Sequence, residues 1–94
     1  MAVEIRYLSS FERALSDLSP SERVLVLAAM AQLAEDWGQP HVHSGLSVRA
    51  LRPSVYECRA SQALRILFTR HGNTLLLRTV GDHRAIRRWL KNNA

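Results

Sequence analysis

Residues 51–83, LRPSVYECRASQALRILFTRHGNTLLLRTVGDH, carry most of the strand signals of this chain. Runs of apolar and β-branched residues alternate in this stretch with turn-forming residues, which is the pattern of consecutive β-strands. Together with the LSVRAL run that overlaps its start, it predicts strands at 46–51, 55–60, 63–70 and 74–80. The links between them are two or three residues long, and links this short join antiparallel neighbours. The sequence therefore predicts a four-stranded antiparallel meander.

A strand and a pair of helices are expected before the meander. Residues 2–8 alternate between apolar and charged side chains, as a half-buried strand does. The two serines that follow can cap a helix that ends near Leu18. The SPSE sequence at 19–22 supplies an N-cap serine, a first-position proline and a capping-box glutamate, so a second helix is expected to run to about Trp37. Its apolar residues form a wide stripe that we expect to pack on the sheet: Val24, Val26, Leu27, Ala28, Met30, Ala31, Leu33 and Ala34.

A third helix is expected at the C-terminus, where Asp82 can serve as its N-cap. Its apolar residues Ile86, Trp89 and Leu90 share one side, and its basic residues lie on the other: Arg84, Arg87, Arg88 and Lys91. The order of elements predicts one α+β domain over residues 1–94, because a chain of this length has room for one core. We expect the helical hairpin to cover one face of the sheet and the other face to be free for a ligand.

Composition and length exclude several classes of protein. Apolar residues make up 47% of the chain and charged residues 22%, which suits a folded globular protein rather than a disordered one. No apolar run approaches the roughly 20 residues of a membrane-spanning helix, and the start of the chain lacks the pattern of a secretory signal. We therefore expect a cytoplasmic protein. The single cysteine, Cys58, is expected to be a small buried hydrophobic residue in a reducing compartment.

Positive charge is concentrated in the second half of the chain. Residues 1–46 carry three basic and six acidic side chains, a balance of −3. Residues 47–94 carry ten basic and two acidic side chains, a balance of +8. This asymmetry favours a polyanion or an acidic protein as the partner of the second half.

Two histidines lie in the glycine- and proline-containing stretch GQPHVHSG, at 38–45. Their spacing could place His41 and His43 on one side of an extended segment as metal ligands. A third ligand is missing nearby, so we predict no metal site and no other cofactor.

Alternation along the strands predicts where two of the arginines point. Arg65 should project to the face opposite its aliphatic neighbours and be solvent-facing. Arg78 should lie on the same side as Leu76 and Val80, in a strand that is apolar on both faces.

The position of Arg59 depends on the strand register. A two-residue Ser61-Gln62 turn would place it opposite Leu64, whereas a three-residue loop would place it opposite Arg65. In the second case the two guanidinium groups would repel each other unless an anion such as a phosphate lay between them. Alternatively, these arginines are solvated strand residues, or surface partners of Glu57.

The LRPSVYECR sequence followed by RILF, together with the order of elements, resembles the RelE/ParE superfamily of toxins from bacterial toxin–antitoxin pairs. The ending VGDHRAI is similar to the Gly-x-His ending of its YafQ-like branch of messenger-RNA endonucleases, in which a histidine at this place takes part in cleavage. The resemblance implies a RelE-like fold and a ribosome-dependent enzyme that cuts messenger RNA through its 2′-hydroxyl. It also implies a cognate antitoxin as a partner, besides the ribosome and messenger RNA.

The resemblance also suggests roles for individual residues. It makes Arg65 the phosphate-contacting arginine, His83 the acid/base residue and Arg59 a supporting cation. The cleavage chemistry also needs proton transfer, for which Glu57 is a second and less favoured candidate. This chain has Val55 and Glu57 where RelE itself tends to have lysines. Further basic residues are expected to bind nucleic acid: Arg49, Arg52, Arg78, Arg84, Arg87 and Lys91.

Two other functions fit the same resemblance. The chain could inhibit DNA gyrase by protein contact, as ParE does, in which case the arginines would serve binding and His83 would be replaceable. It could also be a catalytically inactive binding module on this fold. Translation arrest with messenger-RNA cuts would indicate the endonuclease, and DNA damage without such cuts would indicate the gyrase inhibitor.

Overall fold

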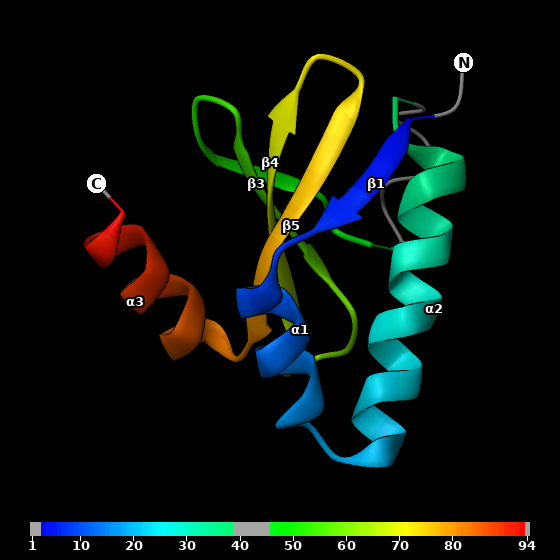
Figure 1. Cartoon of the computed structure of the whole chain (residues 1–94), viewed down its shortest axis with the longest axis vertical. Coiled ribbons are helices and arrows are strands. Elements are labelled where there is room, and N and C mark those ends of the chain that lie inside the picture. The colour runs from blue at the N-terminus through cyan, green and yellow to red at the C-terminus, as the bar shows by residue number, and fades with distance from the viewer. Residues whose placement is uncertain (1–2, 39–45, 94) are drawn as a thin grey trace.

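The computed structural model describes residues 3–38 and 46–93 (Figure 1). The elements are β1 (Glu4–Tyr7), α1 (Ser9–Ser16), α2 (Pro20–Asp36), β2 (Arg49–Arg52), β3 (Val55–Arg59), β4 (Arg65–His71), β5 (Thr74–Gly81) and α3 (His83–Asn92). The predicted strand, helical hairpin, meander and C-terminal helix are all present, which confirms the α+β fold class.

The strands form one sheet in the order β1-β5-β4-β3-β2. Successive strands from β2 to β5 pair antiparallel, which confirms the predicted meander. β1 joins the outer edge of β5 in parallel, with Glu4 opposite Thr74 and Tyr7 opposite Leu77. Parallel neighbours need a long connection, and here the hairpin and three strands supply it.

Helices α1 and α2 pack on one face of the sheet, which we call the first face. It is lined by Leu64, which comes just before β4, and by strand residues of the main core: Cys58, Ile66, Phe68, Leu75, Leu77 and Val80. Phe11 of α1 and Val26 and Leu33 of α2 are buried against them. Cys58 is fully buried, as expected. Desolvation, with a smaller contribution from the charge of Glu57, raises the pKa of its thiol to about 12.

The capping box predicted at the start of α2 is present. Ser19 Oγ accepts a hydrogen bond from the Glu22 backbone N–H at 3.2 Å, and the Ser19 N–H donates to Glu22 Oε1 at 3.0 Å. These hydrogen bonds hold the pKa of Glu22 below its usual value. The helix therefore begins where the sequence predicted.

The apolar stripe predicted for α2 is wrong in part. Val26 and Leu33 are buried, but Val24 is 64% and Leu27 52% exposed, and Ala28 and Ala31 are also exposed. The middle of the helix is apolar on both sides, and one side alone meets the sheet and α1 (Figure 1). Periodicity could not distinguish the two sides, because both carry apolar residues.

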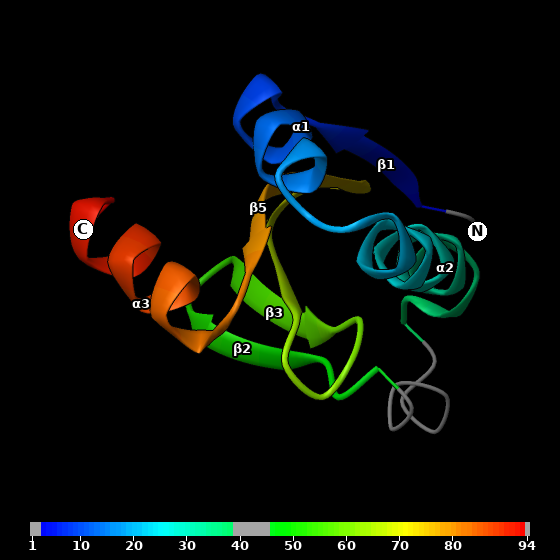
Figure 2. The ribbon, with the colours of Figure 1, turned by 90° about the horizontal axis from the view of Figure 1, so that it is seen from below.

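The opposite face of the sheet, which we call the second face, is lined by Val55, Glu57, Arg65 and Leu67. The prediction that it is free is wrong in part, because α3 packs on part of it, on the side of the sheet opposite α2 (Figure 2). Ile86 of α3 is buried with Val55 and Leu67, and Trp89 and Leu90 pack against them, which confirms the predicted inward side of the helix. The apolar Leu67 points away from α1 and α2, so this face needs a cover of its own.

None of the helices in the described part of the chain is long and apolar enough to cross a membrane.

Candidate nucleic-acid interface

The register places Arg59 directly opposite Arg65, and Arg65 opposite Gly81 of β5. Of the two registers expected for Arg59, the one that places it opposite Arg65 is therefore observed. The connecting loop is wider than a two-residue turn, because the Ala60 N–H donates to the Leu64 carbonyl at 2.9 Å. Residues opposite each other in an antiparallel pair share a face, so both arginines lie on the second face.

Arg65 is less accessible than predicted, since its side chain is 15% exposed. The predicted solvent-facing position is wrong because the second face carries its own apolar cluster with α3. Two of its nitrogens, Nε and Nη1, are buried and have no hydrogen-bond partner among the described residues. An unmade hydrogen bond of a buried group costs about 1–3 kcal/mol, and more for a charged group. Arg65 is thus suited to receive an anionic oxygen.

Glu57 is a buried acid beside these cations, with a side chain that is 7% exposed. Its Oε2 lies 3.2 Å from Arg49 Nη2 and 3.9 Å from Arg65 Nε. Sequence reasoning treated Glu57 as a surface partner and did not anticipate that it is buried and joins the exposed Arg49 to the largely buried Arg65. A signal was present, because strand alternation puts Glu57 and Arg59 on one face and no other acid lies in the strands after residue 46.

His83 is the first residue of α3 and is exposed. It lies two positions after Gly81, the residue opposite Arg65. Asp82 caps the helix as predicted, because its Oδ1 accepts from the Ala85 N–H at 2.9 Å. A side chain at Gly81 would lie 2.7 Å from the Ala85 Cβ, so glycine lets the helix start this close to the strand. The tight turn keeps His83 at the end of the sheet that holds Arg65.

The remaining basic residues divide into two groups. Arg49 is mostly exposed beside Glu57, and three basic side chains on α3 are also exposed: Arg84, Arg87 and Lys91. Arg52 is engaged elsewhere, because its guanidinium donates to the carbonyls of Leu90 at 2.7 Å and Asn93 at 2.9 Å. It therefore secures the C-terminal end of α3.

Arg78 lies at a β-bulge. Leu67 pairs with Thr79 and Phe68 with Leu77, which leaves Arg78 as the extra residue of β5. The bulge shifts the alternation, so Val80 packs in the main core and not on the side predicted for it. Arg78 Nε donates to Thr69 Oγ1 at 3.0 Å, and this hydroxyl also bonds His71 Nε2 at 2.9 Å. The structure does not place Arg78 with the Arg59–Arg65 pair.

Within residues 3–38 and 46–93, no group of three or more metal-ligating side chains could hold a metal ion. His41 and His43 lie outside the described residues.

Solved structures of toxins share this fold. No protein-family model and no curated protein matches the chain. The RelE–RelB complex of Pyrococcus horikoshii matches with a TM-score of 0.70 and 14% identity, over 87% of this chain and 96% of that chain. YafQ of E. coli matches with a TM-score of 0.69 and 12% identity, over 89% and 97%. The toxin–antitoxin complex RelBE2 of Mycobacterium tuberculosis matches with a TM-score of 0.60 and 19% identity, over 88% and 100%.

At these identities the likeness establishes the fold. The chain has the RelE-like fold that the resemblance implied, over nearly the whole length of the compared proteins.

Proposed function

We propose that this protein is the toxin of a toxin–antitoxin pair and that it inhibits translation by cleaving ribosome-bound messenger RNA. The observation that carries the proposal is the pairing of Arg59 with Arg65 on a RelE-like sheet. The unpartnered nitrogens of Arg65 lie at the end of the sheet where the helix bearing His83 begins.

The cleavage chemistry needs three things of the enzyme. It must remove the proton of the 2′-hydroxyl, stabilise charge on the phosphate, and protonate the 5′-oxygen that leaves. Guanidinium groups can bind the phosphate oxygens in pairs as charge develops, and Arg65 with Arg59 takes this role. His83 takes the proton-transfer role, since histidine exchanges protons near neutral pH.

Glu57 supports the site by holding Arg65. Its carboxylate is shared with Arg49, at 3.2 Å, and lies farther from Arg65, at 3.9 Å. Arg65 is thus loosely held by an acid and keeps buried donors that no described residue uses, which a phosphate would engage. A buried carboxylate beside the phosphate site also keeps the arginine from being an unpaired buried charge before RNA binds.

The charge distribution fits both proposed partners. The half of the chain after residue 46 has a balance of +8, which suits RNA and the ribosome, both polyanions. The RelBE2 protein of M. tuberculosis is a toxin–antitoxin complex, and an antitoxin with acidic residues would complement the same cationic region here.

Expression of the chain alone, with mapping of messenger-RNA ends, tests the proposal. We expect growth arrest together with new messenger-RNA ends that depend on translation, because the substrate is RNA in the ribosome. DNA damage without such ends would indicate a gyrase inhibitor and would overturn the nuclease proposal. Growth without cuts or damage would indicate an inactive binding module.

A further inference from the structure

Helix α2 exposes an apolar surface on the side away from the core. We define its outer stripe as Val24, Leu27, Ala28 and Ala31, which follow one another at helical spacing. All four are exposed, with Val24 at 64% and Leu27 at 52%. The opposite side of the helix holds the buried Val26, Ala29 and Leu33.

This stripe has no charge within it. Residues 24–34 contain no acidic or basic side chain over about three helical turns. Arg23, just before them, is bound to the carbonyls of Ser16 and Leu18 at 3.3 and 2.9 Å. A helix that is apolar on all sides is normally buried on all sides, and contiguous exposed apolar surface marks an interaction site. A nucleic acid does not fit this surface, because no cation is available on it.

The outer stripe is complementary to itself. When two copies of α2 lie antiparallel around a two-fold axis between positions 27 and 28, Leu27 lies beside Leu27 of the second copy on one side of the axis, and Ala28 lies beside Ala28 on the other. The same axis places Val24 opposite Ala31. The two leucines thus pack on each other, while the small Ala28 and Ala31 side chains allow the helices to approach closely.

Charge at the ends of the stripe fits the same arrangement. Glu35 is exposed, and in the antiparallel pair it lies opposite Pro20, the first residue of the other α2. The N-terminal end of a helix carries partial positive charge, so an acidic side chain there is favourable. Both ends of the interface gain this interaction because the arrangement is symmetric.

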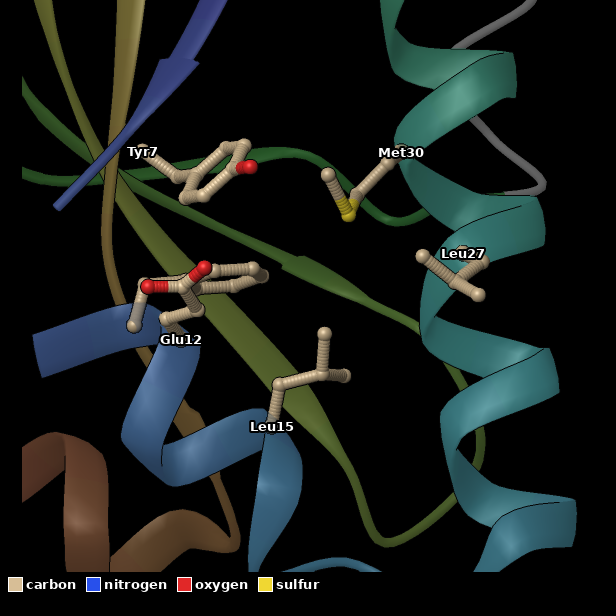
Figure 3. Close-up of a pocket in the computed structure, with 6 residues that line it drawn as sticks. Tyr7, Glu12, Leu15, Leu27 and Met30 are labelled. Atoms are coloured by element: carbon tan, nitrogen blue, oxygen red, sulfur yellow. The ribbon is translucent and has the colours of Figure 1, made fainter. Parts of the chain in front are cut away.

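We propose that two copies of this protein form a homodimer through their outer stripes, with the α2 helices antiparallel. An apolar cleft between α1 and α2 adjoins the interface (Figure 3). Leu27 borders both the cleft and the stripe, with Met30 beside it on α2 and with Tyr7 and Leu15 across the opening (Figure 3). The cleft would lie at the rim of the dimer. This dimer does not rest on the nuclease function, since α2 lies on the side of the sheet opposite α3 and its His83 (Figure 2).

Sedimentation equilibrium of the purified full chain tests the dimer. We expect the wild-type mass to rise to twice 10.7 kDa with concentration. Leu27→Glu should give a monomer at the same concentrations, because it buries a charge in an apolar interface. The matched variant Gln32→Glu adds the same charge on an exposed position of α2 outside the stripe and should still dimerise. A wild type that stays monomeric overturns the proposal, and the stripe then binds a different chain. A Leu27→Glu variant that dimerises like the wild type also overturns it.

Cross-linking tests the orientation and does not depend on a disruptive variant. Ala28→Cys should form a disulfide-linked dimer on mild oxidation, because the two copies of position 28 are offset by only about 1.5 Å along the helices. Ser21→Cys is the matched control, with its two copies about 20 Å apart along the helices. Cys58 does not compete, because it is fully buried. Equal cross-linking at positions 21 and 28, or none at 28, overturns the antiparallel arrangement.

Discussion

The carboxylate of Glu57 lies 3.9 Å from Arg65 Nε in the interior of the second face, and it is shared with Arg49 at 3.2 Å. A buried charge is tolerated when an opposite charge accompanies it. The charge of Glu57 therefore explains how the Arg65 side chain can be only 15% exposed. Two Arg65 nitrogens have no hydrogen-bond partner among the described residues, but the nearby carboxylate balances their charge. The site holds its cation in place before any phosphate arrives.

Glu57→Gln should lower the free energy of unfolding by about 1–3 kcal/mol, because the amide leaves the buried charge of Arg65 unbalanced. Arg49 contributes little to this loss, since it is largely exposed and water screens it. Urea unfolding measures the change. Glu12→Gln is the control at an exposed acid, and it should stay within about 0.5 kcal/mol of wild type. Equal stability of the two variants would contradict the structural role of Glu57.

Arg65→Lys should reduce messenger-RNA cleavage by about 100–1000-fold while leaving the fold intact. Lysine keeps the charge but loses the paired donors that hold phosphate oxygens as charge develops. Cleavage of a defined messenger RNA on ribosomes measures the effect. Arg70→Lys is the control on the same strand, because Arg70 is exposed and bonds the Gly72 carbonyl at 3.1 Å. If the two variants cleave equally well, Arg65 has no special place in the reaction.

Arg52→Ala should destabilise α3 and lower the free energy of unfolding by about 1–3 kcal/mol, because two charge-assisted hydrogen bonds to the end of the helix are lost. Hydrogen exchange should show faster opening of the last turn of α3. Lys91→Ala removes an exposed charge from the same turn and should have little effect. Unchanged exchange in Arg52→Ala would show that these bonds do not secure the helix.

Gly81→Ala should lower the free energy of unfolding by about 1–3 kcal/mol, because its Cβ would lie 2.7 Å from that of Ala85 and one of them must move. The double variant Gly81→Ala/Ala85→Gly removes the clash, although glycine inside a helix costs about 1 kcal/mol. Thermal unfolding of both variants distinguishes the destabilisation caused by the clash from that caused by glycine in the helix. A single variant as stable as wild type would mean that the strand and helix do not need this close approach.

Most of the fold could be predicted because its signals are local. The capping box at Ser19 and Glu22, the cap at Asp82 and the short strand links each depend on residues next to one another in the sequence. The register of Arg59 could not be predicted, because the length of its loop is set by how Ala60 and Leu64 bond.

Other features could not be predicted because they depend on distant parts of the chain. Helical spacing identified the apolar side of α3, but it could not show that this side meets Val55 and Leu67. The bulge at Arg78 shifts the alternation by one residue, and strand periodicity assumes that no such shift occurs. The bonds of Arg52 join residues 38 and 41 positions apart.

Cleavage of messenger RNA by His83→Ala shows whether the Arg65 end of the second face is an active site. His71→Ala is the matched control, since His71 is also exposed but lies at the far end of the strand that bears Arg65. We predict that His83→Ala loses cleavage by about 100-fold or more, as removal of a proton-transfer group does, while it stays folded by circular dichroism and His71→Ala cleaves normally. Wild-type cleavage by a folded His83→Ala variant would contradict the account.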